Sequence, residues 1–461
     1  MQTPYSHSEP YLAQLKGIEQ QIEQHQLQEA ALQLNRLAKD NSHDPRLFLL
    51  GSLVAEAAKN PEGRLVAARK AHELAPQWCV ASIHLAGVLA SRGEAEEAMS
   101  LAEQALQQSE AQGTQATDRM ELLSKAIAVA QRLGRHQPAL QWLRLAEQIR
   151  PDDPSIRYKI GLALSWAGEP ANAVSVFTEL LLQEPHNPVL LSARMQACLG
   201  AHQNAQAIHD GEVLLAVEPT NDEYRFYLDL ARGLTPPTLP VALISNLFDG
   251  YAPRFDQHLV VQLHYKLPRD VAQWIHQWHP DRKGDVLDLG CGTGLLGVCL
   301  GPIEGVLVGV DLSGAMIEQA QRHHVYDSFH RVNVLDALQA TPSELYHVIT
   351  ALDVLIYVGC LDTVIPNAYR ILLPGGRFVF SCETGAGGAA DYALHGTYRY
   401  AHRLSYVQRL LQKSGFEDIQ IEDCVMRYEA GQPVEGFVVV ACRPFPLNRK
   451  NRSRLKQKTV V

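Results

Sequence analysis

The chain has 461 residues, 46% hydrophobic and 20% charged, so it is long enough for two or three domains that each bury a core. Its net charge of −9 argues against general nucleic-acid binding, and it shows neither a signal-peptide pattern nor an apolar stretch of about 18 residues that could span a membrane. None of its eight cysteines belongs to a C-x-x-C pair, which favours reduced thiols, a cytoplasmic location and no metal site.

Up to about residue 232 the sequence predicts an array of paired helices. This part is rich in Ala, Leu, Gln and Glu, and Pro151, Pro185 and Pro219 recur every 34 residues (151 to 185 and 185 to 219), a spacing typical of helix-pair repeats. In the unit that ends at Pro185, small residues mark a close helix approach, a glycine marks the turn and apolar residues form the buried stripe: Gly161, Ala173, Gly168, Leu164, Phe177 and Leu180. The unit around Ala86 repeats this scheme with Gly93, Ala98, Ala102 and Ala105.

These residues resemble the tetratricopeptide repeat family, and the resemblance covers residues 10–232. It implies an α-solenoid in which each helix pair stacks on the next and forms a concave face. A protein or peptide partner on that face is the expected role. The alternative is that the array only spaces or dimerises the rest of the chain.

Residues 233–240 are rich in proline and predict a linker between domains. The segment from Leu247 to Asp256 follows, with Phe, Tyr, Arg and Asp, and leads to a predicted amphipathic helix with Leu259, Leu263 and Leu267. We interpret it as a lid over a bound cofactor, with Tyr251 and Arg254 facing the site. The alternative is a helix that docks on the domain edge.

From Gly284 onward, strand-like and helix-like segments alternate. Asp285–Leu289 is a short apolar run that is followed by the loop Gly290-Cys291-Gly292-Thr293-Gly294 and then by a helical segment, residues 295–300. Glycines between a strand and a helix let backbone N–H groups approach a ligand closely. The next strand, residues 305–310, ends at Asp311, 21 residues after Gly290 (290 to 311), where a carboxylate can accept hydrogen bonds from ribose hydroxyls.

The spacing of the loop separates two nucleoside cofactors. Dinucleotide sites favour G-x-G-x-x-G/A, whereas the third glycine here is Gly294 and Leu295 stands where the longer motif needs a small residue. This pattern suits a cofactor with a nucleoside but no pyrophosphate, which favours S-adenosylmethionine over NAD and methyl transfer over hydride transfer.

Later segments fit the same sheet. Val332–Ala337 is predicted to be a third strand that ends in Asp336, placed to reach an adenine amine, with the Ala337 backbone as a second contact. Tyr346–Asp353 is predicted as the fourth strand, ending beneath the sulfonium, and residues 372–380 as a helix end, a tight turn and the fifth strand.

Val286 to Gly294, Asp311, Asp336 and the run Leu373-Pro374-Gly375-Gly376 resemble the successive motifs of class I S-adenosylmethionine-dependent methyltransferases, over about residues 240–443. With the repeats, the chain resembles bacterial predicted methyltransferases that carry tetratricopeptide repeats. The likeness implies a Rossmann-like domain over 241–443 with a mostly parallel seven-stranded sheet, closed by a hairpin of residues 419–422 and 436–441. Residues 444–461 are predicted to be a basic, disordered tail.

The cofactor contacts that the resemblance implies are Asp288 and Gly290 for the methionine end, Asp311 for the ribose and Asp336 for the adenine. Further implied contacts are Cys291, Gly292, Gly294, Leu312 and Ala337.

Methyl transfer requires the acceptor to be positioned and, for an O or N acceptor, a proton to be removed. His402, Tyr400 and Asp353 are the candidate catalytic residues, His402 first because an imidazole titrates near neutral pH. Arg399 and Tyr357 are the candidate substrate contacts, Arg399 as a clamp on an anionic group. Each also has an ordinary structural interpretation: a buried or surface histidine, a surface charge, and a turn at Asp353.

Together these patterns predict an active methyltransferase with an O or N acceptor on a protein or small metabolite, whose repeats recruit the target or a partner. The alternative is a repeat scaffold whose methyltransferase-like domain only binds or senses S-adenosylmethionine. The glycine spacing disfavours an oxidoreductase.

Overall fold

The computed structural model describes residues 8–249, 266–385, 390–429 and 432–446. The chain divides into two compact units, Met1–Pro219 and Thr220–Val461. Within the described residues, no helix is both long and apolar enough to cross a bilayer.

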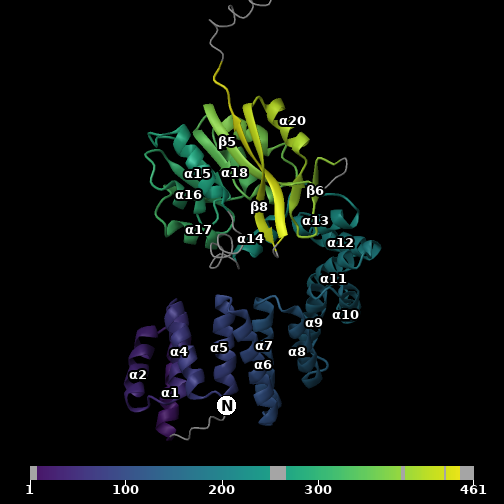
Figure 1. Ribbon diagram of the computed structural model, residues 1–461. Coiled ribbons are helices and arrows are strands. Elements are labelled where there is room, and N and C mark those ends of the chain that lie inside the picture. The colour runs from purple at the N-terminus through teal and green to yellow at the C-terminus, as the bar shows by residue number, and fades with distance from the viewer. Residues whose placement is uncertain (1–7, 250–265, 386–389, 430–431, 447–461) are drawn as a thin grey trace, which may run out of the picture. The chain divides into compact units, whose positions relative to one another are not determined.

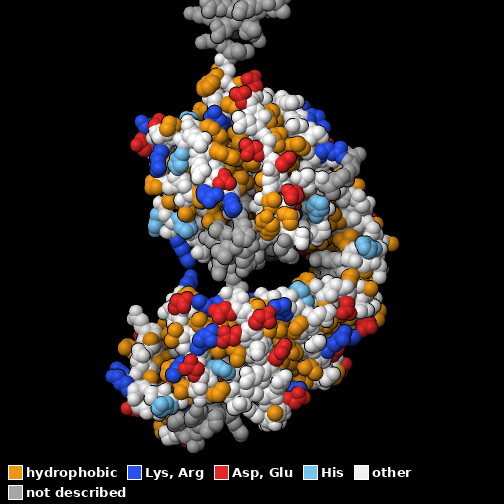
Figure 2. Space-filling model, in the orientation of Figure 1, with side chains coloured by type: hydrophobic (Ala, Val, Ile, Leu, Met, Phe, Trp, Pro, Cys, Tyr) orange, Lys and Arg blue, Asp and Glu red, His pale blue; other side chains and the backbone are white. Residues whose placement is uncertain are grey.

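The first unit is helical throughout its described part, and each helix packs mainly on its neighbours in sequence (Figure 1). Helix α5 also contacts α7, and α9 contacts α11, so successive helix pairs stack in a row. Charged side chains of both signs are interspersed over its surface (Figure 2). Its helices are α1 Glu9–Glu23, α2 Leu27–Asp40, α3 Pro45–Ala57, α4 Pro61–Leu74, α5 Cys79–Arg92, α6 Ala95–Ala111, α7 Ala116–Arg132, α8 His136–Ile149, α9 Pro154–Trp166, α10 Pro170–Gln183, α11 Pro188–Gly200 and α12 Asn204–Val217.

The periodic residues of the sequence have the expected places in these pairs. Pro151, Pro185 and Pro219 each lie two residues after a helix end, where a missing N–H costs no helical hydrogen bond. Gly93 and Gly168 adopt left-handed backbone at the turns inside two pairs. The predicted apolar stripe of the α9–α10 pair is buried. The prediction of paired helices is therefore confirmed.

Gly161 illustrates why a small residue is needed between paired helices. A Cβ at this position would lie 2.5 Å from Cε1 of Phe177, which is fully buried on the facing helix. We expect Gly161→Ala to lower the free energy of unfolding of the first unit by about 1–3 kcal/mol through overpacking. Gly87→Ala is the matched control, because a Cβ there meets nothing within 4 Å. Urea titration should show the two variants apart, and equal midpoints would contradict the packing role.

The second unit contains a sheet with the strand order β3-β2-β1-β4-β5-β9-β8, parallel except for β9, which runs antiparallel to both of its neighbours. A short hairpin, β6–β7, joins the end of β5. The strands are β1 Val286–Leu289, β2 Leu307–Asp311, β3 Ser328–Arg331, β4 Tyr346–Ala351, β5 Leu372–Thr384, β6 Tyr392–Leu394, β7 Tyr400–His402, β8 Glu417–Glu429 and β9 Gln432–Cys442. The helices are α13 Asp222–Ala231, α14 Val241–Asp249, α15 Leu267–Trp278, α16 Leu295–Leu300, α17 Gly314–Gln321, α18 Val334–Ala340, the 3₁₀ turn η3 Leu355–Tyr357, α19 Val364–Ile371 and α20 Leu404–Ser414.

Helices cover both faces of this sheet (Figure 1), because its central strands are apolar on both sides. Val286 and Val348 pack with α15 and α16 on one face, while Leu287 and Ile349 pack with α18, α19 and α20 on the other. The architecture is thus a helical array of paired helices followed by a Rossmann-like domain with a mostly parallel seven-stranded sheet, and the predicted fold class is confirmed.

One predicted strand is wrong. Residues 332–337 do not form the third strand, because β3 ends at Arg331, opposite Asp311, and α18 begins at Val334. Asn333 caps this helix by accepting a hydrogen bond from the Leu335 N–H at 2.8 Å. A short apolar run before a helix and a strand look alike in sequence, and the cap decides between them. Asp336 consequently lies in the first turn of a helix.

Candidate active site

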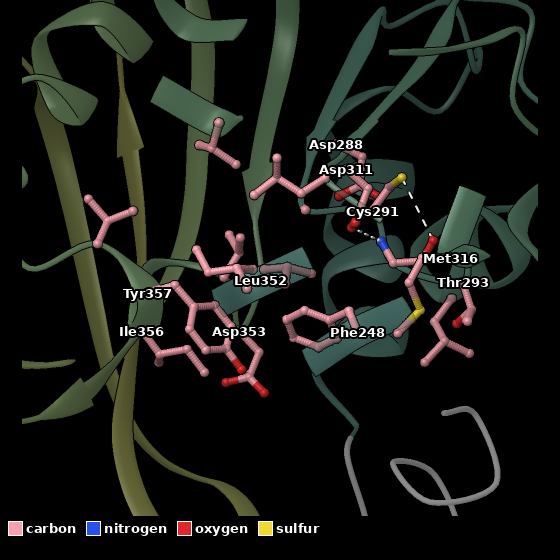
Figure 3. Close-up of a pocket in the computed structure, with 18 of the residues that line it drawn as sticks. Phe248, Asp288, Cys291, Thr293, Asp311, Met316, Leu352, Asp353, Ile356 and Tyr357 are labelled. Carbon is pink, nitrogen blue, oxygen red and sulfur yellow. Dashed lines mark hydrogen bonds between the residues drawn. The ribbon is translucent and has the colours of Figure 1, made fainter. Parts of the chain in front are cut away.

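A pocket of about 310 Å³ opens at the carboxyl ends of β1 and β4 (Figure 3). From β1 the chain builds the sheet outward through β2 and β3, whereas β4 and β5 extend it in the other direction. In open α/β sheets this reversal of strand order leaves a crevice that binds ligands. The loop after β1 forms one end of the pocket, with Asp288, Cys291 and Asp311 (Figure 3). Asp353, Ile356 and Tyr357 form the opposite end.

The loop along the crevice requires glycines because its backbone conformation is available only to glycine at low cost. Gly290, Gly292 and Gly294 all have positive φ, between 53° and 85°. The amide groups of Gly290 and Cys291 both donate to the Val310 carbonyl, at 2.7 and 2.9 Å, which fastens the loop to β2. Of the residues predicted here, Gly290, Cys291 and Gly292 line the pocket, whereas Gly294 is the N-terminal cap of α16 and does not line it.

Two carboxylates stand at this end of the pocket. Asp311, the last residue of β2, accepts from the Gly292 N–H at 2.9 Å and from the Ser313 N–H at 2.8 Å, so its orientation is fixed by the loop itself. Asp288 is buried and accepts from the hydroxyls of Tyr326 and Thr350, both at 2.7 Å. Burial raises the pKa of Asp288 to about 6, although both hydroxyl hydrogen bonds oppose the rise. Leu312 lines the pocket beside them.

The two residues that the sequence predicts as adenine contacts do not line this pocket. Asp336 is exposed and, like the buried Ala337, is absent from the pocket wall. Asn333 and Val334 line the pocket instead, at the junction between β3 and α18. Because residues 332–337 are not a strand, the acid lies one helical turn beyond the sheet edge.

The predicted lid is described only at its start. Tyr251 and Arg254 lie outside the described residues, as do Leu259 and Leu263. Phe248, at the end of α14, does line the pocket, and its ring meets that of Tyr357 edge to face at a centroid distance of 5.5 Å (Figure 3). An aromatic pair of this geometry forms an apolar wall between the two ends.

The end of the pocket opposite the glycine loop carries the candidate acceptor-binding groups: Asp353, Tyr357, Arg399 and Arg427. Burial raises the pKa of Tyr357 to about 12, and the nearby Asp353 contributes, so its phenol stays protonated at neutral pH. The sequence had suggested the first three of these residues. Among the described residues, no cluster of three or more His, Cys, Asp or Glu side chains could hold a metal ion.

The structure separates His402 and Tyr400 from the pocket. His402 is fully buried, and its Nε2 lies 2.9 Å from the Val358 carbonyl and 3.1 Å from that of Gly359. Two carbonyl partners require the proton to sit on Nε2, which then donates to both. The Tyr400 hydroxyl donates to the Pro236 carbonyl at 2.9 Å. Both side chains therefore bind backbone carbonyl groups and do not line the pocket.

This backbone includes the proline-rich segment 233–240. The Leu239 N–H donates to the Tyr357 carbonyl, and the amides of Gly359 and Cys360 both donate to the carbonyl of Pro237. Thr238 bridges to Val358 and lines the pocket. Residues 237–239 are thus bonded to the loop after β4, so a segment whose composition suggests only a linker helps to shape the Asp353 end of the pocket.

The buried position of His402 predicts a pH dependence of stability. Burial lowers its pKa to about 4, whereas the unfolded chain has the ordinary value of about 6.5. As the pH falls, His402 is therefore protonated in the unfolded chain before it is protonated in the folded chain. The free energy of unfolding should decrease by up to about 3 kcal/mol between pH 6.5 and pH 4. His402→Gln, which keeps a donor at this place, should remove that dependence in urea titrations of the second unit. The half-buried His84 of the first unit also has a lowered pKa and is unaffected by this change. Parallel pH curves for the variant and the wild type would contradict the assignment.

Comparisons with known proteins agree with this geometry. Residues 287–378 match the family model of a methyltransferase domain. Two curated relatives are ubiquinone biosynthesis O-methyltransferases: that of Pseudomonas entomophila is 33% identical over 113 residues, and that of Pseudomonas savastanoi pv. phaseolicola is 31% identical over 125. The alignments cover 24% and 25% of this chain, and the chain spans about half the length of each relative, 49% and 53%.

Among solved structures, the chain is similar to magnesium protoporphyrin IX methyltransferase from Synechocystis PCC 6803 with bound S-adenosylhomocysteine. The identity is 18% and the TM-score 0.36, over 44% of this chain and 99% of that protein.

Proposed function

We propose that this chain, whose C-terminal unit carries an S-adenosylmethionine-dependent methyltransferase domain, transfers a methyl group to an oxygen or nitrogen acceptor bound at the Asp353 end of the pocket. The proposal rests on one observation: the glycine loop and the polar side chains at the Asp353 end line the same pocket, at its two opposite ends. A cofactor end and an acceptor end in one crevice are what a bound methyl donor and its acceptor need.

The residues at the glycine loop fit the cofactor. A Cβ at Gly290 would lie 2.5 Å from a methyl carbon of Val354, so the close approach of this loop excludes larger residues. Asp311 would hold the ribose, Asp288 the methionine end, and Asn333 and Val334 the adenine. When bound there, S-adenosylmethionine supplies an electrophilic methyl group on a positively charged sulfur.

The chain's own part in the reaction is to bind and orient the acceptor and to receive its proton. Arg399 and Tyr357 would orient the acceptor through hydrogen bonds, and Phe248 and Ile356 would exclude water. As the acceptor oxygen or nitrogen gains the methyl group, its remaining hydrogen becomes strongly acidic. A carboxylate is then basic enough to accept that proton, and Asp353 is the carboxylate at this end.

An oxygen acceptor is the first one to test, because the curated relatives named above are O-methyltransferases. For the first unit, we propose that the helix pairs are tetratricopeptide repeats whose concave face binds a protein or peptide, either the methyl acceptor or a partner. The eight cysteines of the whole chain are all free, which supports a reducing, cytoplasmic location.

Calorimetry with S-adenosylmethionine, S-adenosylhomocysteine and NAD tests the cofactor. We expect both sulfur compounds to bind and NAD not to bind; NAD binding without a response to the other two would overturn the proposal. Transfer is tested by incubating the protein with a bacterial extract and tritiated S-adenosylmethionine. Binding without any labelled product would favour the scaffold alternative.

Removal of residues 1–219 separates a small-molecule acceptor from a recruited protein. The cut precedes α13, because Phe226 and Tyr227 of this helix pack on Tyr398 at centroid distances of 5.9 and 6.3 Å. If the acceptor is a small molecule, labelling should survive the truncation. If the repeats recruit a protein acceptor, labelling of that protein should be lost while cofactor affinity is unchanged.

A further inference from the structure

A buried arginine stands beside the acceptor end of the pocket, on a strand that is otherwise exposed along much of its length. Arg427 lies near the end of β8, the edge strand of the sheet, and its side chain is only 2% exposed. Strand residues normally alternate between faces, yet Met426 and Arg427 are both buried. The pairing of β8 with β9 shifts register between Val425 and Arg427, which marks an irregularity that turns the arginine inward to the pocket.

The guanidinium of Arg427 joins two carboxylates, one in the loop after β4 and one on β5. Its Nη1 donates to Asp353 Oδ1 at 2.8 Å, and its Nη2 donates to Glu383 Oε1 at the end of β5. The side chains of Asp353 and Glu383 are 15% and 10% exposed. Three charged groups thus share a nearly dry site, where charge-assisted hydrogen bonds are strong and an unpaired charge is costly.

The backbone of Asp353 is held as firmly as its carboxylate. Asp353 follows β4 and has a φ of 55°, a left-handed conformation that few residues other than glycine adopt. Its N–H donates to the hydroxyl of the buried Ser381 at 2.8 Å. Such backbone outliers persist where the surroundings impose them, and they concentrate at functional sites.

We propose that Arg427 is a positioning residue for methyl transfer: it keeps the Asp353 carboxylate charged and aimed at the acceptor, and Glu383 in turn fixes Arg427. The inference rests on the proposed function. Well-packed apolar residues stabilise a core at least as well as a buried ion cluster does, so stability alone does not account for three charges in this place. A carboxylate that accepts a proton must be ionised beforehand, whereas burial in a largely apolar pocket would by itself favour the neutral acid. The positive charge of Arg427 beside Asp353 counteracts that effect of burial.

The first test measures the charge of Asp353 directly. Carbon-13 NMR of aspartate carboxyl groups, with Asp353→Asn to assign the signal, gives the pKa of Asp353 in the wild type and in Arg427→Met. We expect the pKa to rise by about one to three units in the variant and less in Arg427→Lys, which keeps the charge but loses the two-pronged contact. The other ionisable groups around this carboxylate are Glu383, Tyr357, Arg399 and Cys424, and they are unchanged in both variants. An unchanged pKa in a folded Arg427→Met protein overturns the inference.

The second test separates positioning from cofactor binding. With tritiated S-adenosylmethionine and a bacterial extract, Arg427→Met should lose about 10- to 100-fold in transfer rate, while its affinity for S-adenosylhomocysteine stays within about threefold of the wild type. Arg427→Lys should recover part of the rate. Arg409→Met, which breaks an exposed ion pair with Asp391, is the matched control and should change neither quantity.

If Arg427→Met does not fold, the double variant Arg427→Met/Glu383→Gln removes one cation and one acid together and takes its place in both measurements. Full transfer activity in a folded variant that lacks Arg427 overturns the inference and leaves the proposed function standing. A wild-type chain that transfers nothing overturns the proposed function, and the NMR titration then decides alone whether Arg427 sets the charge of Asp353.

Discussion

Replacement of Asp311 by alanine is expected to weaken the binding of S-adenosylhomocysteine by about 100-fold or more. The carboxylate is the proposed ribose acceptor, and it also receives the amides of Gly292 and Ser313. Its loss removes charge-assisted hydrogen bonds to the ribose, at about 1.5–3 kcal/mol for each bond to a charged group. The amides of Gly292 and Ser313 lose this acceptor in the free and the bound protein alike, so that loss lowers stability and not affinity. The affinity loss should therefore reach about 3 kcal/mol, which corresponds to roughly two orders of magnitude.

Two further variants make this measurement specific. Asp311→Asn keeps one acceptor oxygen and should fall between the wild type and the alanine variant. Asp336→Ala removes the acid that the sequence assigned to the adenine. This residue is exposed and does not line the pocket, so calorimetry should show little change in the affinity for S-adenosylhomocysteine. A loss of affinity in Asp336→Ala that equals the loss in Asp311→Ala would contradict the placement of the adenine at Asn333 and Val334.

Gly290→Ala is expected to disrupt both the cofactor end and the stability of the second unit. Gly290 combines a φ of 69° with a Cβ position 2.5 Å from Val354 Cγ2 and 2.7 Å from its Cβ. A side chain there is strained by its backbone conformation and must also displace the loop after β4. We expect a loss of about 2–4 kcal/mol in the free energy of unfolding, from strain and overpacking together. Cofactor binding should fall below detection in calorimetry.

Gly301 provides the control for Gly290. It also has a positive φ, 63°, but a Cβ there meets no atom within 4 Å. Gly301→Ala therefore carries only the backbone cost, about 1–3 kcal/mol because φ 63° and ψ −171° lie in a region nearly restricted to glycine, and should bind the cofactor normally. If urea titration finds both alanine variants equally destabilised, steric closeness to Val354 is not what requires a glycine in the loop.

The cofactor half of the site could be anticipated because its signals are local. A strand, three glycines with positive φ and an acid at the end of the next strand follow one another within about 25 residues, and adjacent parallel strands bring them together automatically. The helix pairs were predictable for a similar reason, since prolines and small residues recur with the period of the repeat. Among the strands of the cofactor half, only the predicted third one, residues 332–337, was wrong, because Asn333 caps a helix.

The acceptor half depended on contacts that sequence spacing does not encode. His402 and Tyr400 were plausible catalytic residues by chemistry, but the pairing of β7 with β5 buries them behind the pocket. Residues 237–239 look like part of a linker by composition, and their bonds to the loop after β4 join positions about 120 residues apart.

Arg427 shows the difference most clearly. In the sequence it stands among alternating polar and apolar residues of a terminal hairpin, and nothing marks it as buried. The shifted register of β8 turns it inward, 74 positions from Asp353 and 44 from Glu383. The sequence by itself determined the helix pairs and the glycine loop, because these depend on residues close together in the chain. The tertiary structure alone decided which charged side chains meet at the Asp353 end of the pocket, because burial and strand register bring distant residues to one place.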